Sequence, residues 1–212
     1  MRRVTSSPAR VRRPVDKFEE RRRELADATL LTLAELGYAR TSLRTIAQNT
    51  PFSHGVLHYY FADKAELITY CVRRFKAACI QRYDGIIAGV TTPVELATAC
   101  GDGLAATLTE DASLHRLWYD LRAQSMFEDA LRPEVTEIDA SLQDMIWRVV
   151  TAYGELSGSA PIFSPSVAYG LFDGMFEQAL IRHLVGVPTA LDDLRTGANL
   201  LLPQLFAAAR TH

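Results

Sequence analysis

Residues 41–67 read TSLRTIAQNTPFSHGVLHYYFADKAEL. This stretch contains two short helical patterns, one after the other. Thr41 or Ser42 can cap the first helix. Pro51 breaks it, and Ser53 can cap the second helix. Because two short helices joined by a tight turn form a helix-turn-helix, the stretch predicts that motif.

The second of these helices combines an apolar side with an unusual outer side. Leu57 and Phe61 are four residues apart, so they share one face and can anchor the helix in a core. The opposite side carries Gly55, Val56, His58 and Tyr59. A solvated face would normally use Glu, Lys or Gln, which are stronger helix formers than Gly, His and Tyr. A bare backbone, a phenol and an imidazole suit contact with base edges in the major groove of DNA.

The charge of the chain is divided unevenly along its length. Residues 1–64 hold 12 Lys and Arg against 7 Asp and Glu, a net charge of +5, whereas residues 65–212 hold 11 against 18, a net charge of −7. A basic N-terminal third indicates that this end meets a polyanion, and uneven surface charge without a partner is the alternative. Lys64 is consistent with a polyanionic partner. A cation in the first turn of a helix is destabilised by the helix dipole by roughly 0.3–1 kcal/mol, and a phosphate bound by Lys64 and the free amides there would offset this cost.

The rest of the chain has helical spacing of apolar residues and almost no strand-like alternation. We therefore expect an all-α fold of about nine helices, three of them in an N-terminal helix-turn-helix domain that begins with a helix at about 17–36. Pro203 should kink the last helix. After the helix-turn-helix, helices are expected at about 63–85, 93–109, 113–130, 133–154, 164–185 and 190–209.

Composition excludes several classes of protein. No apolar run approaches the roughly 18–20 residues needed to span a bilayer, and the Arg-rich N-terminus lacks the apolar stretch of a secretory signal. We expect a cytoplasmic protein. The three cysteines (Cys71, Cys79 and Cys100) are an odd number without CxxC spacing, so buried reduced thiols are expected.

Patterns that imitate enzyme or metal sites are incomplete. The segment GDGLAA, with Gly101, Gly103 and Ala106, imitates a dinucleotide-binding fingerprint, but a helical segment precedes it instead of a strand. His54 and His58 have the spacing of metal ligands, yet no carboxylate or third histidine accompanies them. We therefore predict no catalytic residues, no metal and no cofactor.

The quoted stretch resembles a known family. Over about residues 20–68 it is similar to the DNA-binding domain of the TetR family of bacterial transcriptional regulators. The shared pattern is a small Ser/Thr pair, an Ile-Ala, a Ser-x-Gly, then Leu-x-aromatic-aromatic-Phe and a lysine that starts a helix. This sequence departs from the family at Pro51 and Phe52, where Gly-Val is usual, and at His58, where Tyr is common.

The resemblance assigns roles by position. It implies contacts to DNA phosphates from Ser42, Arg44, Ser53 and Lys64. It implies that the residues facing the groove are His54, Gly55, Val56, His58, Tyr59 and Tyr60. Of these, Tyr60 lies nearest to the inward side of the helix.

The resemblance also implies a domain plan and a function. A flexible basic arm at 1–14 would precede a helix-turn-helix DNA-binding domain at 15–64 and a ligand-binding and dimerisation domain at 65–212. The chain would be a homodimeric, ligand-responsive, sequence-specific transcriptional regulator, a repressor released from double-stranded operator DNA by an unidentified small-molecule effector. It would be no enzyme and would not bind membranes. The alternative is an all-α small-molecule-binding protein or enzyme with an incidental basic N-terminus.

One face of the segment SVAYGLFDGMFEQALIRHLVG (166–186) suits a dimer interface. Two glycines four residues apart let another helix approach closely, at a cost of about 1 kcal/mol each against alanine. In the family, the last two helices pair with those of a second copy, whereas packing on an internal helix is the alternative. The face consists of Val167, Gly170, Leu171, Gly174, Gln178 and Ile181.

The opposite face of that segment is aromatic and should point into the subunit. Aromatic side chains with a few polar groups suit a small-molecule cavity between helices, and simple core filling is the alternative. No cluster of polar groups identifies the ligand. The predicted pocket consists of Trp118, Tyr119, Arg122, Met126, Trp147, Tyr169, Phe172 and Phe176.

Overall fold

The computed structural model describes residues 14–207, and in this range it contains eight α-helices, one short 3-10 helix and no strand beyond a single bridge between Pro161 and Phe206. The expectation of an all-α fold is confirmed. The elements are α1 (Pro14–Leu36), α2 (Leu43–Gln48), α3 (His54–Tyr60), α4 (Lys64–Ala88), α5 (Pro93–Ser125), η1 (Asp129–Leu131), α6 (Arg132–Ser157), α7 (Pro165–Leu184) and α8 (Ala190–Gln204).

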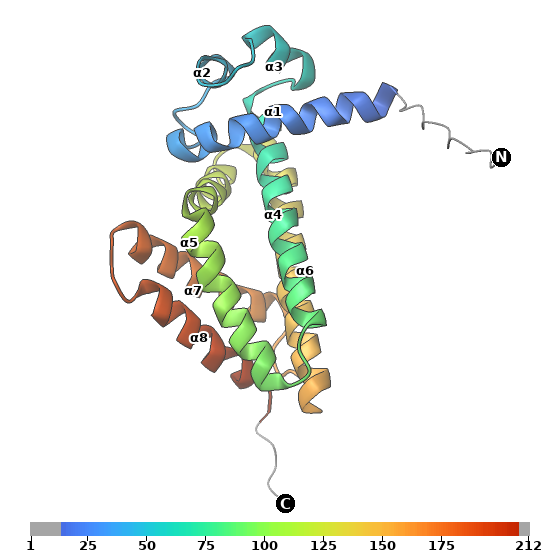
Figure 1. Ribbon diagram of the computed structural model, residues 1–212, viewed down its shortest axis with the longest axis vertical. Helices are drawn as coiled ribbons and strands as arrows, with labels where there is room; N and C mark the ends of the chain where they lie inside the picture. The colour runs from blue at the N-terminus through green and yellow to red at the C-terminus, as the bar shows by residue number, and fades with distance from the viewer. Residues whose placement is uncertain (1–13, 208–212) are drawn as a thin grey trace, which may run out of the picture.

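Helices α1–α3 form a head at one end of the molecule, and α5–α8 form a body (Figure 1). Helix α4 runs from the head along the body, beside α5 and α6. Helices α7 and α8 lie side by side on the flank of the body. Within residues 14–207, no helix is both long enough and apolar enough to cross a membrane.

The head is joined to the C-terminal half of α5. Gly37 ends α1 with a positive φ of 74°, which a residue with a side chain rarely adopts. The next backbone amide, that of Tyr38, donates to Asp120 Oδ2 at 2.6 Å. Arg116 Nη2 donates to the carbonyl oxygen of Ala34 at 2.6 Å. These contacts satisfy the backbone groups that the end of α1 leaves free.

The two helices expected at 93–109 and 113–130 form one bent helix, α5. Only Asp111 leaves the helical region, at φ −127° and ψ 25°. Because no Pro or Gly lies between 109 and 113, helical hydrogen bonding resumes after the bend. The last helix ends at Gln204 instead of 209, one residue after Pro203.

The glycines of the GDGLAA segment serve helix packing. A Cβ atom on Gly101 would lie 2.7 Å from the carbonyl oxygen of Arg195 in α8, and one on Gly103 would lie 2.9 Å from Ile86 of α4. Both distances are shorter than van der Waals contact. The two glycines therefore let α5 approach α8 and α4 closely, which accounts for them without a dinucleotide.

Candidate DNA-binding surface and effector cavity

Serine side chains set where the two short helices of the head begin. Ser42 Oγ accepts a hydrogen bond from the amide of Thr45 at 3.0 Å, and Ser53 Oγ accepts one from the amide of Val56 at 3.3 Å. Each caps the first turn of its helix. Both serines are exposed, as is Arg44 on α2, so all three side chains are accessible to a partner from outside.

The inward side of α3 is held by a few apolar contacts. Leu57 and Phe61 are almost fully buried, with 0% and 1% of their surfaces exposed. Phe52, in the turn, is half-buried and packs against the core, so the departure from Gly-Val supplies an additional anchor. Tyr60 is also half-buried, and its ring centroid lies 4.8 Å from that of Phe18 in α1. Tyr60 therefore packs α3 against α1 and is less open than Tyr59, the other tyrosine of the predicted groove-facing set.

The outward side of α3 is open. Tyr59 is 73% exposed, and the exposed rings of His54 and His58 meet edge to face with centroids 4.4 Å apart. A Cβ atom on Gly55 would have only Ser53 Oγ near it, at 4.0 Å, and the φ of Gly55 is not positive. Neither packing nor backbone conformation requires this glycine, so its bare backbone is available to a partner from outside. Val56, at the margin of this surface, is half-buried.

Lys64 has a structural partner that the sequence did not reveal. Its Nζ donates to the carbonyl oxygen of Tyr38 at 3.3 Å and lies 3.9 Å from the centroid of the Tyr38 ring. The half-buried ammonium therefore ties the start of α4 to the end of α1. An ammonium has three N–H donors, so two are left for a phosphate.

A cavity of about 60 Å³ lies between α4, α5, α6 and α7. Five of the eight predicted pocket residues line it: Trp118, Tyr119, Tyr169, Phe172 and Phe176. Its other walls are mainly apolar, from Leu104, Leu142, Met145 and Ile146.

The remaining three predicted pocket residues lie elsewhere. Arg122 points to a neighbouring surface hollow, where it pairs with Asp173 at 2.5 Å. Met126 is 67% exposed, beyond the last turn of α5. Trp147 is half-buried and packs against the core outside the cavity lining. Helical periodicity shows which residues share a face of a helix, but it does not show which neighbouring helix covers that face. The sequence therefore grouped these three residues with those of the cavity.

The cavity contains a buried polar cluster that sequence reasoning missed. Lys76 Nζ lies 3.1 Å from His115 Nδ1, and His115 Nε2 lies 3.1 Å from Thr107 Oγ1. Lys76 and His115 are only 5% and 3% exposed. The sequence did indicate that Lys76 is buried, because it shares a helical face with Cys79 and Tyr83, three and seven residues further along.

Burial shifts the acid–base properties of this cluster. Loss of solvation lowers the pKa of Lys76 to about 8. Burial, followed by the neighbouring positive charge of Lys76, lowers the pKa of His115 to about 2. At neutral pH the lysine is therefore charged and the histidine is neutral. Because an ammonium can only donate, His115 Nδ1 accepts from Lys76 and its Nε2–H donates to Thr107.

The six residues of the predicted dimer face are all exposed in the single chain. Val167, Leu171 and Ile181 are exposed by 45%, 41% and 58%. A Cβ atom on Gly170 or Gly174 would meet nothing within 4 Å. Packing of these glycines on an internal helix is therefore excluded. Leu200 of the adjacent helix α8 is 60% exposed and extends the apolar surface.

Comparisons with known proteins agree with this geometry. Residues 25–71 match the family described as bacterial regulatory proteins, tetR family. The regulator BetI of Paraburkholderia xenovorans is 44% identical over 55 residues, which are 26% of this chain and 28% of that protein. BetI of Cronobacter sakazakii is 25% identical over 198 residues, 91% of this chain and 94% of that protein.

A solved structure shares most of the fold. The transcriptional regulator FadR from Bacillus subtilis, solved in complex with stearoyl-CoA, superposes with a TM-score of 0.69 at 18% identity. The superposition covers 85% of this chain and 96% of that one. The motif, its geometry and the order of helices agree with these comparisons. Residues 25–71 match the helix-turn-helix domain of bacterial regulatory proteins of the tetR family, and the chain shares its fold with solved transcriptional regulators.

Proposed function

We propose that this protein is a homodimeric repressor that binds operator DNA through α3 and is released by a small molecule bound between α4, α5, α6 and α7. The outer side of α3 carries this proposal, since Gly55, His58 and Tyr59 are open while Leu57 and Phe61 hold the helix in place. Two heads on one dimer would bind a near-palindromic operator with a half-site spacing set by the dimer. The proposed site of action is the cytoplasm.

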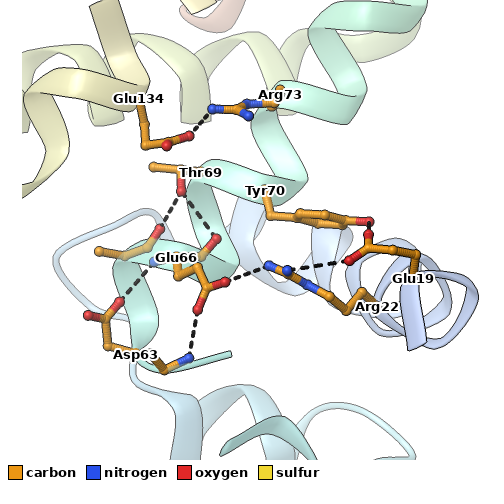
Figure 2. A network of polar contacts seen from close by, with 10 residues as sticks. Glu19, Arg22, Asp63, Glu66, Thr69, Tyr70, Arg73 and Glu134 are labelled. Carbon is orange, nitrogen blue, oxygen red and sulfur yellow. Dashed lines mark hydrogen bonds and ion pairs between the residues drawn. The ribbon is translucent and has the colours of Figure 1, made fainter. Parts of the chain in front are cut away.

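Helix α4 connects the proposed effector cavity with the head. Lys76 lies in the cavity, and Glu66, near the N-terminus of the same helix, pairs with Arg22 of α1 at 2.6 Å (Figure 2). The Arg22 guanidinium also covers the ring of Phe61, 4.7 Å from its centroid. A displacement of α4 therefore moves α1 and, through Phe61, the end of α3.

The other side of α4 is tied to the body. Arg73 pairs with Glu134 and, at 2.9 Å, with Glu137, both on α6 (Figure 2 shows the first of these). A ligand that separates α4 from α6 works against these pairs and changes the position of the head. A coupling of about 1–3 kcal/mol would change operator affinity by roughly 5–150-fold.

Mobility shifts with the protein's own promoter DNA test the proposal. We expect Tyr59→Ala to lower the ratio of operator affinity to random-DNA affinity, because a base contact is lost. The loss corresponds to roughly 1–3 kcal/mol of discrimination free energy. Lys64→Ala should weaken binding to both DNAs and lower the salt slope by about one. Circular dichroism should show a folded head in both variants. If Tyr59→Ala leaves the ratio of operator to random-DNA affinity unchanged while Lys64→Ala abolishes it, the assignment of base reading to Tyr59 and phosphate binding to Lys64 is wrong.

Two other functions give different results in that assay. An all-α binding protein or enzyme with an incidental basic N-terminus would shift no promoter fragment. A DNA-packaging protein would shift all fragments equally in competition with random DNA.

The predicted basic arm, residues 1–14, lies almost wholly outside the described residues. Its arginines at 2, 3, 10, 12 and 13 could enter the minor groove or rest on phosphates. Deleting 1–14 is then expected to weaken binding to every sequence and to flatten the salt dependence, since each phosphate contact contributes a slope near 0.9. An unchanged slope would mean that the arm is a solvated tail.

A further inference from the structure

The cavity holds a cation without a counter-ion. Lys76 is 5% exposed, and its hydrogen bond to His115 is to a neutral group. Among residues 14–207, no carboxylate lies at ion-pair distance from it. Asp173 also lines the cavity, but its carboxylate is occupied by Arg122 at 2.5 Å and by the hydroxyl of Tyr119 at 3.0 Å. Because buried charges in proteins are normally paired, this arrangement is incomplete.

Two further donors in the cavity wall lack partners. Within the described part of the chain, Trp118 Nε1 and the Tyr83 hydroxyl are buried and have no hydrogen-bond partner. The indole ring of Trp118 has its centroid 5.5 Å from Lys76 Nζ. Tyr83 lies about 10 Å further along α4, at 1.5 Å per residue, and therefore faces another part of the same cavity. Buried donors without acceptors are rare enough in folded proteins to need an explanation.

The polar cluster cannot supply the missing acceptor. His115 Nδ1 already accepts from Lys76, and its Nε2 is directed to Thr107. The remaining walls are apolar or aromatic, such as Leu104, Ile146 and Phe172. The cavity therefore offers one positive end and an apolar body, and its volume of about 60 Å³ favours a short molecule.

We infer that the effector is a small, mainly apolar monocarboxylate whose carboxylate pairs with Lys76 and accepts a hydrogen bond from Trp118 Nε1. The aliphatic or aromatic part of the molecule contacts the apolar walls. A cationic ligand would be repelled by Lys76, and a neutral amide would leave its charge unpaired. That the ligand acts as an effector rests on the proposed function, but the binding site itself does not require DNA.

Binding to the full chain without DNA tests this inference. The probes are propionate, butyrate and hexanoate, each compared with its amide and with the amine of matching carbon skeleton. The chain has two tryptophans, so Trp147→Phe leaves Trp118 as the single reporter in the cavity. We expect at least one carboxylate to raise the melting temperature, to change Trp118 fluorescence and to bind at least tenfold tighter than its amide and its amine.

A variant with a matched control tests the role of Lys76. Lys76→Met keeps the length of the side chain and removes the charge, so the carboxylate should bind at least tenfold more weakly and no better than the amide. Lys17→Met, at an exposed lysine of α1, should leave the affinity unchanged. The comparison of carboxylate with amide in the unaltered chain stands even if Lys76→Met fails to fold.

Three results would overturn the inference. These are equal binding of carboxylate and amide, full carboxylate affinity in Lys76→Met, and no binding by any of the three carboxylates. Operator binding is measured separately by mobility shift. A chain that binds operator but prefers no carboxylate contradicts only the inference, whereas carboxylate binding that depends on Lys76 without operator binding contradicts only the proposed function.

Discussion

Replacing Gly174 with leucine is expected to convert the proposed dimer into a folded monomer that has lost its operator affinity. Gly174 lies on the exposed apolar face of α7, and a side chain there meets nothing within 4 Å in the single chain. Leucine therefore fits the monomer and even favours the helix, by about 1 kcal/mol. The same side chain would occupy the space into which a second α7 must fit. Loss of the second head should lower operator affinity by roughly 10²–10⁴-fold.

Light scattering and mobility shift measure these two effects, and a melting curve shows that the fold survives. Gly85→Leu is the matched control, because Gly85 is also exposed, lies in helix α4 and would have nothing within 4 Å of an added Cβ atom. It should leave both the dimer and operator binding unchanged. A stable Gly174→Leu dimer at micromolar concentration would contradict the assignment of this face.

Replacing Lys76 with methionine is expected to stabilise the free protein at neutral pH. The pKa of Lys76 falls from 10.5 to about 8, so the folded state binds this proton more weakly than the unfolded state. The buried charge therefore lowers the free energy of unfolding by an amount on the order of 3 kcal/mol. This destabilisation is fully present below pH 8 and fades as the pH rises toward 10.5. Methionine removes this destabilisation but also the hydrogen bond to His115. We therefore expect the free energy of unfolding at pH 7 to rise by about 1–3 kcal/mol, which is roughly 2–12 °C in melting temperature.

The pH dependence of that gain is the decisive measurement. The difference in melting temperature between the variant and the unaltered chain should shrink between pH 7 and pH 10. Asp111, Asp173 and Arg122 are present in both proteins and act on Lys76 in the unaltered chain only through charge, and His115 is neutral over this range. Cysteines and tyrosines with raised pKa values titrate in both proteins and largely cancel in the difference, although Cys79 is coupled to Lys76. A difference that stays constant or grows would show that Lys76 is not a buried cation at pH 7.

The head could be predicted from sequence because its determinants are local. Leu57 and Phe61 fix the inward side of α3 by their spacing alone, and Ser53 starts the helix with its own side chain. Lys64 is different, since its contact with Tyr38 depends on how the end of α1 packs against α4.

The cavity could be predicted only in part, because its chemistry comes from residues far apart in the chain. Lys76 and His115 are 39 residues apart, and neither belongs to a motif. Trp118 and Phe172 were predictable because large aromatic side chains are usually buried wherever a helix packs. Met126 lies outside the cavity, in the neighbouring surface hollow, because α5 ends just before it, which periodicity does not show.

The bend at Asp111, the joint, divides α5 into two arms that contact different parts of the molecule. Before Asp111, α5 is fixed to α8, where Asp102 pairs with Arg195 at 2.7 Å. Beyond the joint, Arg116 and Asp120 hold the head. From the bend to Asp120 the arm is about 13 Å long, at 1.5 Å per residue, so a rotation of about 5° would displace this contact with the head by roughly 1 Å. Since His115 and Trp118 alternate along this arm with the two residues that hold the head, a molecule that fills the cavity would act directly on the part of α5 that positions the head.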